Sequence, residues 1–400
     1  MFTQSYGRFL ALSAIVFAAL VALSIAFCVY VDPYGMYGTG RIVGKPQIYR
    51  QASLARSYML ERVRPATLVL GNDAVEMGLD PASQDWPDGA KPVFNAAGAG
   101  VDVFMAWRLL QHDIAIKPPQ FVVVGLDFLD FVDPDAQRDT QPPRKDEARL
   151  LTGRDGRPNT SRSIQLWEDF FATTLSRRAI ADSIKTFRSR NIPPTVTMSE
   201  LGFNPSHDYE SLRRTSGTEA IFSDNDMMYR AQYRASLPSY FYSPQRNLQF
   251  RALANIVRLA VQNDIRLVVY IPPYHSRYLE ILHETGFWPG FEAWKRALVR
   301  TVDDVAGNRR NLVLLYDFSG YDDISGERVP APGDTQAEMR WYRDAAHYTS
   351  ALGNLMIASM MAASPVLGEE LNDATLEDHL KRVRRDRDRL FAPIDIQAAR

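Results

Sequence analysis

The chain has 400 residues, of which 46% are hydrophobic and 23% charged, a composition that excludes a wholly disordered or fibrous chain. Its 46 lysines and arginines balance 47 aspartates and glutamates, so it lacks the basic excess that nucleic-acid-binding proteins usually carry. The single cysteine, Cys28, excludes an internal disulfide and a Cys-x-x-Cys metal site.

The first feature along the chain is an uncharged, apolar run from Phe9 to Val31. A helix needs about 20 residues to cross the hydrocarbon core of a bilayer, so this run is long enough. Arg8 before it and Asp32 after it favour a cytoplasmic N-terminus, residues 1–8. We predict a single-pass anchor over 9–31 in the cytoplasmic (inner) membrane. A cleaved signal sequence and a buried core helix are the alternatives.

Beyond the anchor, a membrane-proximal segment, 32–64, leads into five short β-rich runs on the periplasmic, extracytoplasmic side. Several of these runs are apolar throughout, as expected for parallel strands covered on both faces. The connections between them are too long for hairpins and predict helical crossovers. The pattern predicts an α/β fold, a doubly wound, mostly parallel sheet flanked by helices. The expected strands are 67–71, 93–96, 121–126, 266–271 and 312–316.

The expected α/β core comprises residues 65–130 and 247–363. Between its two parts, residues 131–246 lose the strand pattern, and we interpret them as a largely helical insertion or cap. The C-terminal tail, 364–400, contains a predicted amphipathic helix over 375–391 with a basic outer face. That helix is either a solvated surface helix or one that contacts anionic lipid headgroups.

Polar residues follow nearly every predicted strand. Because ligands of open α/β sheets bind beyond the carboxyl ends of the strands, we expect these residues to line one site. They are Asn72 and Asp73 after the first strand, Asn95, Gly98 and Gly100 after the second, Asp127 after the third, Tyr274, His275 and Arg277 after the fourth, and Asp344, His347 and Tyr348 before the last helix of the core.

The pair Asp344 and His347 is the most specific element of this set. A carboxylate three residues before an imidazole can hold one ring N–H and leave the other nitrogen free as a base. A surface ion pair or a helix cap is the alternative. Gly98 and Gly100 can bring backbone N–H groups to an oxyanion, or simply form a tight strand-to-helix turn.

We expect no metal and no cofactor. The histidines form no His-x-His or His-Glu-x-x-His pair, which argues against zinc. The sequence also carries no glycine-rich phosphate-binding loop of either common type.

The order of these blocks resembles the SGNH (GDSL-like) hydrolase superfamily, in particular its membrane-anchored envelope members that act in lipoteichoic-acid D-alanylation and polysaccharide O-acetylation. The resemblance covers about residues 65–130 and 247–363, together with the N-terminal apolar run. Asp344-x-x-His347 matches the late Asp-x-x-His block of the family, and Gly98 or Gly100 matches the second block. Gly71-Asn72-Asp73 stands at the Gly-x-Ser block, and Gly125-Leu126-Asp127 stands at the Gly-x-Asn block.

The resemblance implies acyl (O-acetyl) transfer or ester hydrolysis on a cell-envelope polysaccharide; a membrane-bound O-acyltransferase is the membrane partner expected if the chain is instead an assembly subunit. It implies that His347 is the base and Asp344 its orienter, and that Asn72 and the glycine backbone hold the oxyanion. Asp73, however, stands at the serine position. A carboxylate there would pair with His347, raise the pKa of its imidazole and repel an oxyanion.

A second hypothesis follows from that departure. The chain would then be a non-catalytic glycan-binding or assembly subunit of a polysaccharide modification or export complex. The two hypotheses make the same assignment of site residues and differ in whether the site turns over an ester.

Overall fold

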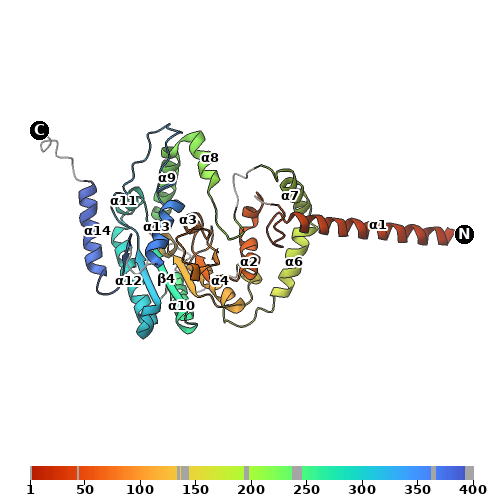
Figure 1. Cartoon of the computed structure of the whole chain (residues 1–400), viewed down its shortest axis with the longest axis horizontal. Helices are drawn as coiled ribbons and strands as arrows, with labels where there is room; N and C mark the ends of the chain where they lie inside the picture. Colours follow the sequence, from red (N-terminus) through yellow and green to blue (C-terminus); the bar gives the residue numbers. More distant parts are fainter. Residues whose placement is uncertain are drawn as a thin grey trace. The chain divides into compact units, whose positions relative to one another are not determined.

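The computed structural model describes residues 2–42, 45–132, 136, 144–192, 198–236, 246–361 and 366–391. The chain divides into two compact units (Figure 1). Unit 1 comprises Met1–Arg62 with Arg144–Glu200, and unit 2 comprises Val63–Pro143 with Leu201–Arg400.

Unit 2 is built around a six-stranded sheet in the order β2-β1-β3-β4-β5-β6. The first five strands are parallel, and β6 pairs antiparallel with β5. Nearly all side chains of β1, β3 and β4 are buried, because both faces of the sheet are covered. This confirms the predicted α/β fold with a mostly parallel sheet flanked by helices. The strands are β1 (Thr67–Leu70), β2 (Val93–Asn95), β3 (Phe121–Gly125), β4 (Arg266–Ile271), β5 (Val313–Asp317) and β6 (Glu369–Glu370).

The helices that cover the sheet form two groups. In one, α10 (Leu248–Gln262) packs between α4 (Val103–Ile116) and α12 (Trp288–Ala306) and against β4 and β5. In the other, α3 (Asp73–Gly78) packs against α13 (Ser350–Met361). Right-handed crossovers in this strand order place the two groups on opposite faces of the sheet.

The contact between α3 and α13 depends on two glycines. A Cβ atom added to Gly353 would lie only 1.9 Å from the carbonyl oxygen of Gly78. A Cβ atom on Gly78 would in turn collide with the ring of Tyr348. The small residues therefore let α3, which begins with Asp73, approach α13 and the segment that carries His347.

The remaining helices of unit 2 lie around this core. The long helix α9 packs against α5, α8 and α11, and α14 packs against α12. These helices are α5 (Phe128–Val132), α8 (His207–Ser216), α9 (Thr218–Ser236), α11 (Ser276–Glu284) and α14 (Leu376–Leu390), with short 3-10 turns at Asp88–Ala90 and Gly307–Leu312.

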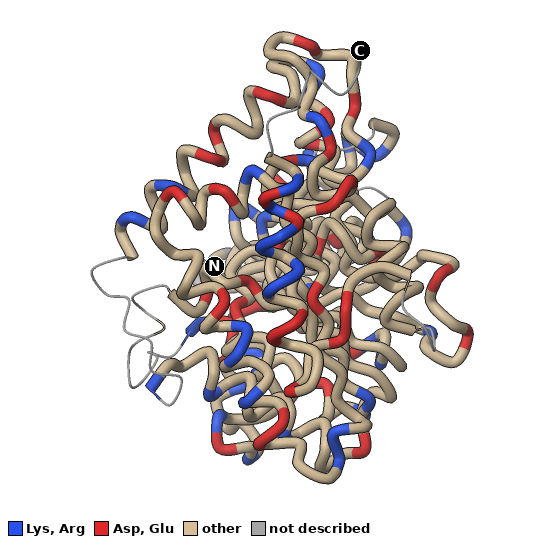
Figure 2. Tube along the Cα trace, turned by 90° about the vertical axis from the view of Figure 1, so that its left-hand side faces the viewer, with Lys and Arg blue, Asp and Glu red and all other residues tan. Residues whose placement is uncertain are grey.

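The C-terminal helix α14 is amphipathic. Leu376, Leu380 and Val383 on its inner face are buried. On its outer side, arginines pair with acids of neighbouring helices, for example Arg387 with Glu280 at 2.7 Å. Figure 2 views the molecule from the side where α14 lies and shows basic and acidic residues interspersed rather than segregated.

Unit 1 contains the long apolar helix α1 (Phe2–Val31). Its segment Tyr6–Val31 is long and apolar enough to cross a membrane, consistent with a single-pass anchor or a signal sequence. The other elements are α2 (Ala52–Val63), α6 (Arg162–Thr174), α7 (Arg177–Arg188) and short 3-10 turns at Ile48–Gln51 and Lys145–Arg149.

The C-terminal end of α1 is part of the core of unit 1. It packs against α6 and α7, and Ser24 Oγ donates a hydrogen bond of 2.9 Å to the carbonyl oxygen of Thr174. Cys28 is fully buried in a cluster with Tyr34, Leu54 and Ala179. The outer part of this helix, by contrast, is exposed along most of its length.

Candidate functional site

The candidate site lies where β1 and β3 end. The strand order reverses around β1, since the chain moves from β1 outward to β2 and then back to β3. At such a switch point the loops after neighbouring strands diverge and leave a crevice. The structure brings the predicted residues Asp73, after β1, and His347, before α13, together here. His347 Nε2 lies 3.5 Å from Asp73 Oδ1.

Asp344 and His347 form a local turn. Asp344 Oδ1 accepts the backbone N–H groups of Ala346 at 2.8 Å and of His347 at 2.9 Å. His347 Nδ1 lies 2.8 Å from Asp344 Oδ2. Because a carboxylate can only accept, Nδ1 carries a proton that it donates to Asp344. The three-residue spacing therefore does orient the imidazole.

Two further residues hold Asp344. The Tyr209 hydroxyl donates a hydrogen bond of 2.7 Å to Asp344 Oδ2, and Asn225 Nδ2 donates one of 2.6 Å to the same oxygen. Burial raises the pKa of Asp344, but the charge and hydrogen bond of His347, with the backbone and Tyr209 bonds, lower it further. Its pKa therefore lies below the ordinary value, and the buried carboxylate is ionised.

No sequence motif marks Tyr209 or Asn225. They come from α8 and α9, within residues 131–246, where no motif was found. Only the packing of these helices over the end of the sheet brings their side chains to Asp344.

His347 is a cation at neutral pH. Burial lowers the pKa of its imidazole, but Asp344 and Asp73 raise it, and their effect dominates. The pKa of His347 thus lies well above its ordinary value. One ring nitrogen faces Asp344 and the other faces Asp73, so neither offers a lone pair to a substrate. The imidazole is therefore not available as a general base in this state.

Asp73 is partly accessible, with 41% of its side chain exposed. It is the first residue of α3, directly after Asn72, whose side chain caps the helix by accepting the N–H of Ala74 at 3.2 Å. Burial raises the pKa of Asp73, whereas His347 and the backbone N–H groups of Asp73 and Ala74 lower it below its ordinary value. The amides at the start of α3 thus already face an anion, the Asp73 carboxylate.

Asp127 adds a third carboxyl group to the crevice, at the end of β3. It accepts hydrogen bonds from Asn72 Nδ2 at 2.9 Å, from the Tyr274 hydroxyl at 3.2 Å and from the N–H of Leu129 at 2.9 Å. Burial and the nearby Asp73 charge raise its pKa, and these effects exceed the lowering by the hydrogen bonds. Asn72 and Tyr274 are therefore directed toward Asp127.

Two residues predicted to line the site have structural partners instead. Gly98 donates its backbone N–H to the carbonyl oxygen of Gly71 at 3.0 Å. Asn95 is buried, and its Nδ2 donates to the carbonyl oxygens of Val75 at 3.0 Å and Leu79 at 2.9 Å. Both residues thus hold the loop and the end of α3. Gly100 lies further along, exposed, with φ +80.

Three more predicted residues brace the surroundings of the site. His275 is buried. Its Nδ1 accepts the backbone N–H of Arg277 at 3.2 Å, and its Nε2 donates to the carbonyl oxygen of Glu327 at 2.8 Å. Burial lowers the pKa of His275 to about 4, so it is neutral. The Arg277 guanidinium pairs with Glu219 at 2.7 Å and Asp226 at 2.6 Å, which joins α11 to α9.

Tyr348 lies beneath α3. Its hydroxyl shares a hydrogen bond of 2.8 Å with that of Tyr270, and its ring packs on Gly78. Within the part of the chain that the structure describes, histidine, cysteine, aspartate and glutamate side chains form no group of three that could hold a metal ion.

The arrangement is an Asp73–His347–Asp344 ion triad at the switch point of the sheet. The chain matches no family model and no curated protein. The findings establish an α/β protein with a mostly parallel six-stranded sheet, in the order 2-1-3-4-5-6, flanked by helices and preceded by a long apolar helix.

Proposed function

We propose that this chain is a membrane-anchored, extracytoplasmic protein of the SGNH-hydrolase type that binds a cell-envelope polysaccharide without serine-type turnover. The observation that carries the proposal is the contact of 3.5 Å between Asp73 and a His347 ring whose other nitrogen is held by Asp344. It is the geometry of a Ser-His-Asp site in which a carboxylate stands for the serine.

The chemistry of a serine hydrolase requires a hydroxyl that gives its proton to a neutral imidazole. Asp73 has no such proton, and His347 already carries one on each ring nitrogen. The negative charge of Asp73 also lies where a developing oxyanion would need donors. We therefore expect no ester turnover by the usual route.

The same side chains suit the binding of hydroxyl groups. The partly exposed Asp73 carboxylate accepts hydrogen bonds, and Asp127, whose pKa is raised, offers a second polar group beside it. Polysaccharide as the ligand class comes from the resemblance to the envelope members of the family.

The anchor is supported by the way α1 ends. Its last residues, including the fully buried Cys28 and Val31, belong to the packed core of unit 1. Removal of α1 as a signal sequence would take these side chains out of that core. A retained helix leaves the packing complete, which favours an anchor.

The decisive experiment restores the serine. Full-length protein in detergent micelles is assayed for hydrolysis of p-nitrophenyl acetate. We expect no His347-dependent turnover in the natural sequence and measurable turnover in Asp73→Ser, because a hydroxyl beside an imidazole oriented by Asp344 recreates the missing pair. The double variant Asp73→Ser/His347→Ala should lose that turnover.

Asp88→Ser is the matched control, since it makes the same change at a fully exposed position. Its activity should equal that of the natural sequence. Turnover by the natural sequence that disappears in His347→Ala would contradict the proposal.

A second candidate function is acyl transfer with Asp73 itself as the nucleophile. The exposure of its carboxylate favours this candidate, because a substrate can reach it. Attack of the carboxylate on an ester carbonyl would form a mixed anhydride between Asp73 and the acyl group and break the ester C–O bond, and the alkoxide would leave as the alcohol with a proton from the His347 imidazolium. Trapping the acylated carboxylate with hydroxylamine, followed by mass analysis of the Asp73 peptide, would demonstrate it. Asp73→Asn should abolish the adduct.

A further inference from the structure

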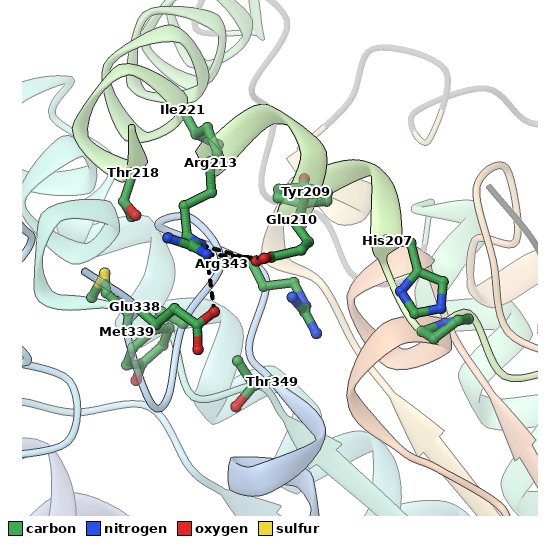
Figure 3. A pocket seen from close by; sticks show the side chains of 12 residues that line it. His207, Tyr209, Glu210, Arg213, Thr218, Ile221, Glu338, Met339, Arg343 and Thr349 are labelled. Carbon is green, nitrogen blue, oxygen red and sulfur yellow. Dashed lines mark hydrogen bonds and ion pairs between the residues drawn. The ribbon is translucent and has the colours of Figure 1, made fainter. Parts of the chain in front are cut away.

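A pocket of about 320 Å³ lies beside the ion triad, bounded by α8, the start of α9 and the loop that leads to Asp344 (Figure 3). Tyr209 belongs to both places, because it lines the pocket and donates its hydroxyl to Asp344. A ligand in this pocket would therefore lie next to the triad. The volume falls at the lower end of the range for ligand sites, about 300–1,000 Å³, and suits a small unit rather than a large cofactor.

The two arginines that line the pocket differ in their hydrogen bonds and ion pairs. Arg213 is neutralised, with Glu210 at 2.9 Å and Glu338 at 3.0 Å, as the dashed lines in Figure 3 show. The Arg343 side chain makes no hydrogen bond or ion pair with the residues that the structure describes, and its Nε is buried without a partner.

Arg343 is nevertheless charged. Burial lowers the pKa of its guanidinium, and the more distant Asp208, Glu210 and Glu338 oppose that effect. Since the ordinary pKa of arginine is above 12, the side chain remains a cation. The guanidinium is only partly buried, but its buried Nε lacks a hydrogen-bonding partner, and an anionic ligand in the pocket would supply one.

Two residues with hydroxyl groups also line the pocket. Thr218 Oγ1 and the Tyr342 hydroxyl are both buried, and neither has a hydrogen-bond partner in the described chain. Each can donate to and accept from a hydroxyl group of a ligand. One guanidinium fork together with two hydroxyl groups matches a sugar unit that carries a carboxylate.

We propose that this pocket is a subsite for an acidic sugar unit, with Arg343 binding its carboxylate. The inference rests on the proposed function and names the charge class of the polysaccharide. A carboxylate would form two parallel N–H···O bonds with the guanidinium, which a neutral sugar cannot do.

Calorimetric titration of the full-length protein in detergent micelles tests this assignment. The probes are tri-galacturonate, cellotriose as a neutral oligosaccharide of equal length, and inorganic phosphate. We expect tri-galacturonate to bind about tenfold or more tightly than the other two. Arg343→Gln should remove that preference, and Arg343→Lys should recover only part of it, since lysine cannot form the paired bonds.

Arg340→Gln is the control, because Arg340 is an exposed arginine of the same loop that packs over Trp341 instead. Its binding should equal that of the natural sequence, and thermal unfolding should show that all variants fold. Equal binding of cellotriose, preferential binding of phosphate, or unchanged binding in Arg343→Gln would each overturn the inference while leaving glycan binding intact. If neither oligosaccharide binds, the proposed function itself fails.

A separate observation in unit 1 carries a second inference. Three large apolar side chains of α6 are exposed along one stripe: Ile164 at 64%, Trp167 at 63% and Phe171 at 51%. Ile184 and Phe187 of α7 are exposed as well. The opposite side of α6 is buried through Asp169 and Thr173, so the apolar stripe faces away from the core of this unit.

These helices adjoin the end of α1. Besides the bond from Ser24 to Thr174, the rings of Phe27 and Phe187 meet edge to face at 6.2 Å. A span of about 20 residues that starts at Phe9 ends close to Cys28, which places this contact at the outer boundary of the bilayer. Tryptophan is enriched at that boundary, and tryptophan and phenylalanine are typical of the apolar face of helices that lie in it.

The charges of α7 point to the same environment. Arg177, Arg178, Lys185 and Arg188 are all exposed, whereas the one acid of this helix, Asp182, is buried and bound by the Tyr34 hydroxyl at 2.7 Å. We infer that the exposed faces of α6 and α7 lie in the headgroup region of a bilayer that contains anionic phospholipid. This inference rests on α1 being a membrane anchor.

Quenching by brominated lipid tests this second inference in full-length protein reconstituted into phosphatidylethanolamine–phosphatidylglycerol vesicles. The contribution of Trp167 is obtained by subtracting the fluorescence of Trp167→Phe from that of the natural sequence. We expect acyl chains brominated near the headgroup to quench it by about half or more, because interfacial side chains enter about 5–10 Å. The contribution of Trp341, a residue of unit 2, is obtained in the same way with Trp341→Phe and should not be quenched by the brominated lipid.

An unquenched Trp167 in protein that stays in the vesicles would overturn the inference and leave the anchor standing. Protein that does not remain with the vesicles would instead contradict the anchor.

Discussion

The charge of His347 decides which chemistry the crevice can perform. Its ring lies between Asp344 at 2.8 Å and Asp73 at 3.5 Å, and both carboxylates hold the proton on the imidazole. A serine at position 73 would leave one ring nitrogen free. One side chain thus converts a base into a fixed cation.

The first prediction concerns this proton. In Asp73→Asn, one of the two carboxylates loses its charge, so the pKa of His347 should fall while remaining above its ordinary value because Asp344 is intact. Histidine-selective ¹⁵N NMR titration of the full-length protein in micelles measures it. Asp88→Asn, an exposed change of the same kind, should leave the His347 titration unmoved. A neutral imidazole at pH 7 in the natural sequence would refute this account.

The second prediction is the pH dependence of stability. The pKa of His347 is raised in the folded state, so its stabilising effect is complete below about pH 6.5, the unfolded value, and is lost as the pH rises toward the folded-state pKa. Asp73 and Asp344 have lowered pKa values, so their contributions are complete above about pH 3.9 and are lost in acid.

The natural sequence should therefore have a higher free energy of unfolding than His347→Gln, and this difference should be largest between about pH 4 and 6.5 and should shrink above that range. Urea unfolding at several pH values measures this difference. His207→Gln, at an exposed histidine, is the control and should show no such trend. A difference that grows above pH 7 would mean that His347 is neutral in the folded protein.

At the scale of elements, a buried ion cluster fixes α14 to the sheet. Asp317, at the end of β5, lies 2.5 Å from Lys295 of α12 and 2.8 Å from His379 of α14. Asp317 is buried, and although burial raises its pKa, its interactions with Lys295 and His379 lower it well below its ordinary value. The cluster therefore joins a strand and two helices.

The third prediction follows from this cluster. Asp317→Asn leaves the buried Lys295 ammonium without a counterion, which should lower the free energy of unfolding by about 3–5 kcal/mol. Chemical denaturation measures the change. Asp386→Asn, on the outer side of α14, should change stability by about 0.5 kcal/mol or less. An equally small effect of Asp317→Asn would show that the ammonium finds another partner or water.

At the scale of the whole molecule, the fourth prediction is the topology. With α1 retained and its N-terminus in the cytoplasm, the chain that follows α1 lies on the extracytoplasmic side. Alkaline phosphatase fused to the C-terminus in a bacterial host should be active, since the enzyme matures only outside the cytoplasm. The protein should also stay with membranes after alkaline carbonate extraction. An inactive fusion would reverse the orientation, and a shortened, released protein would identify α1 as a signal sequence.

The sequence by itself determined the features that depend on neighbouring residues. Runs such as residues 121–125 and 266–271 are almost entirely apolar. This pattern is typical of a strand whose two faces are both covered by other elements. The apolar length of α1 follows in the same way from its residues. The Asp344–His347 turn closes within three residues, so the sequence could predict it.

The tertiary structure decided the contacts that join distant segments. Asp73 meets His347, and Tyr209 and Asn225 reach Asp344, because strand order and helix packing bring these segments together. For the same reason, the backbone N–H of Gly98, which we predicted to bind an oxyanion, instead donates to the carbonyl oxygen of Gly71. A side chain's partner depends on every element packed around it, and this information is not present in the few residues on either side.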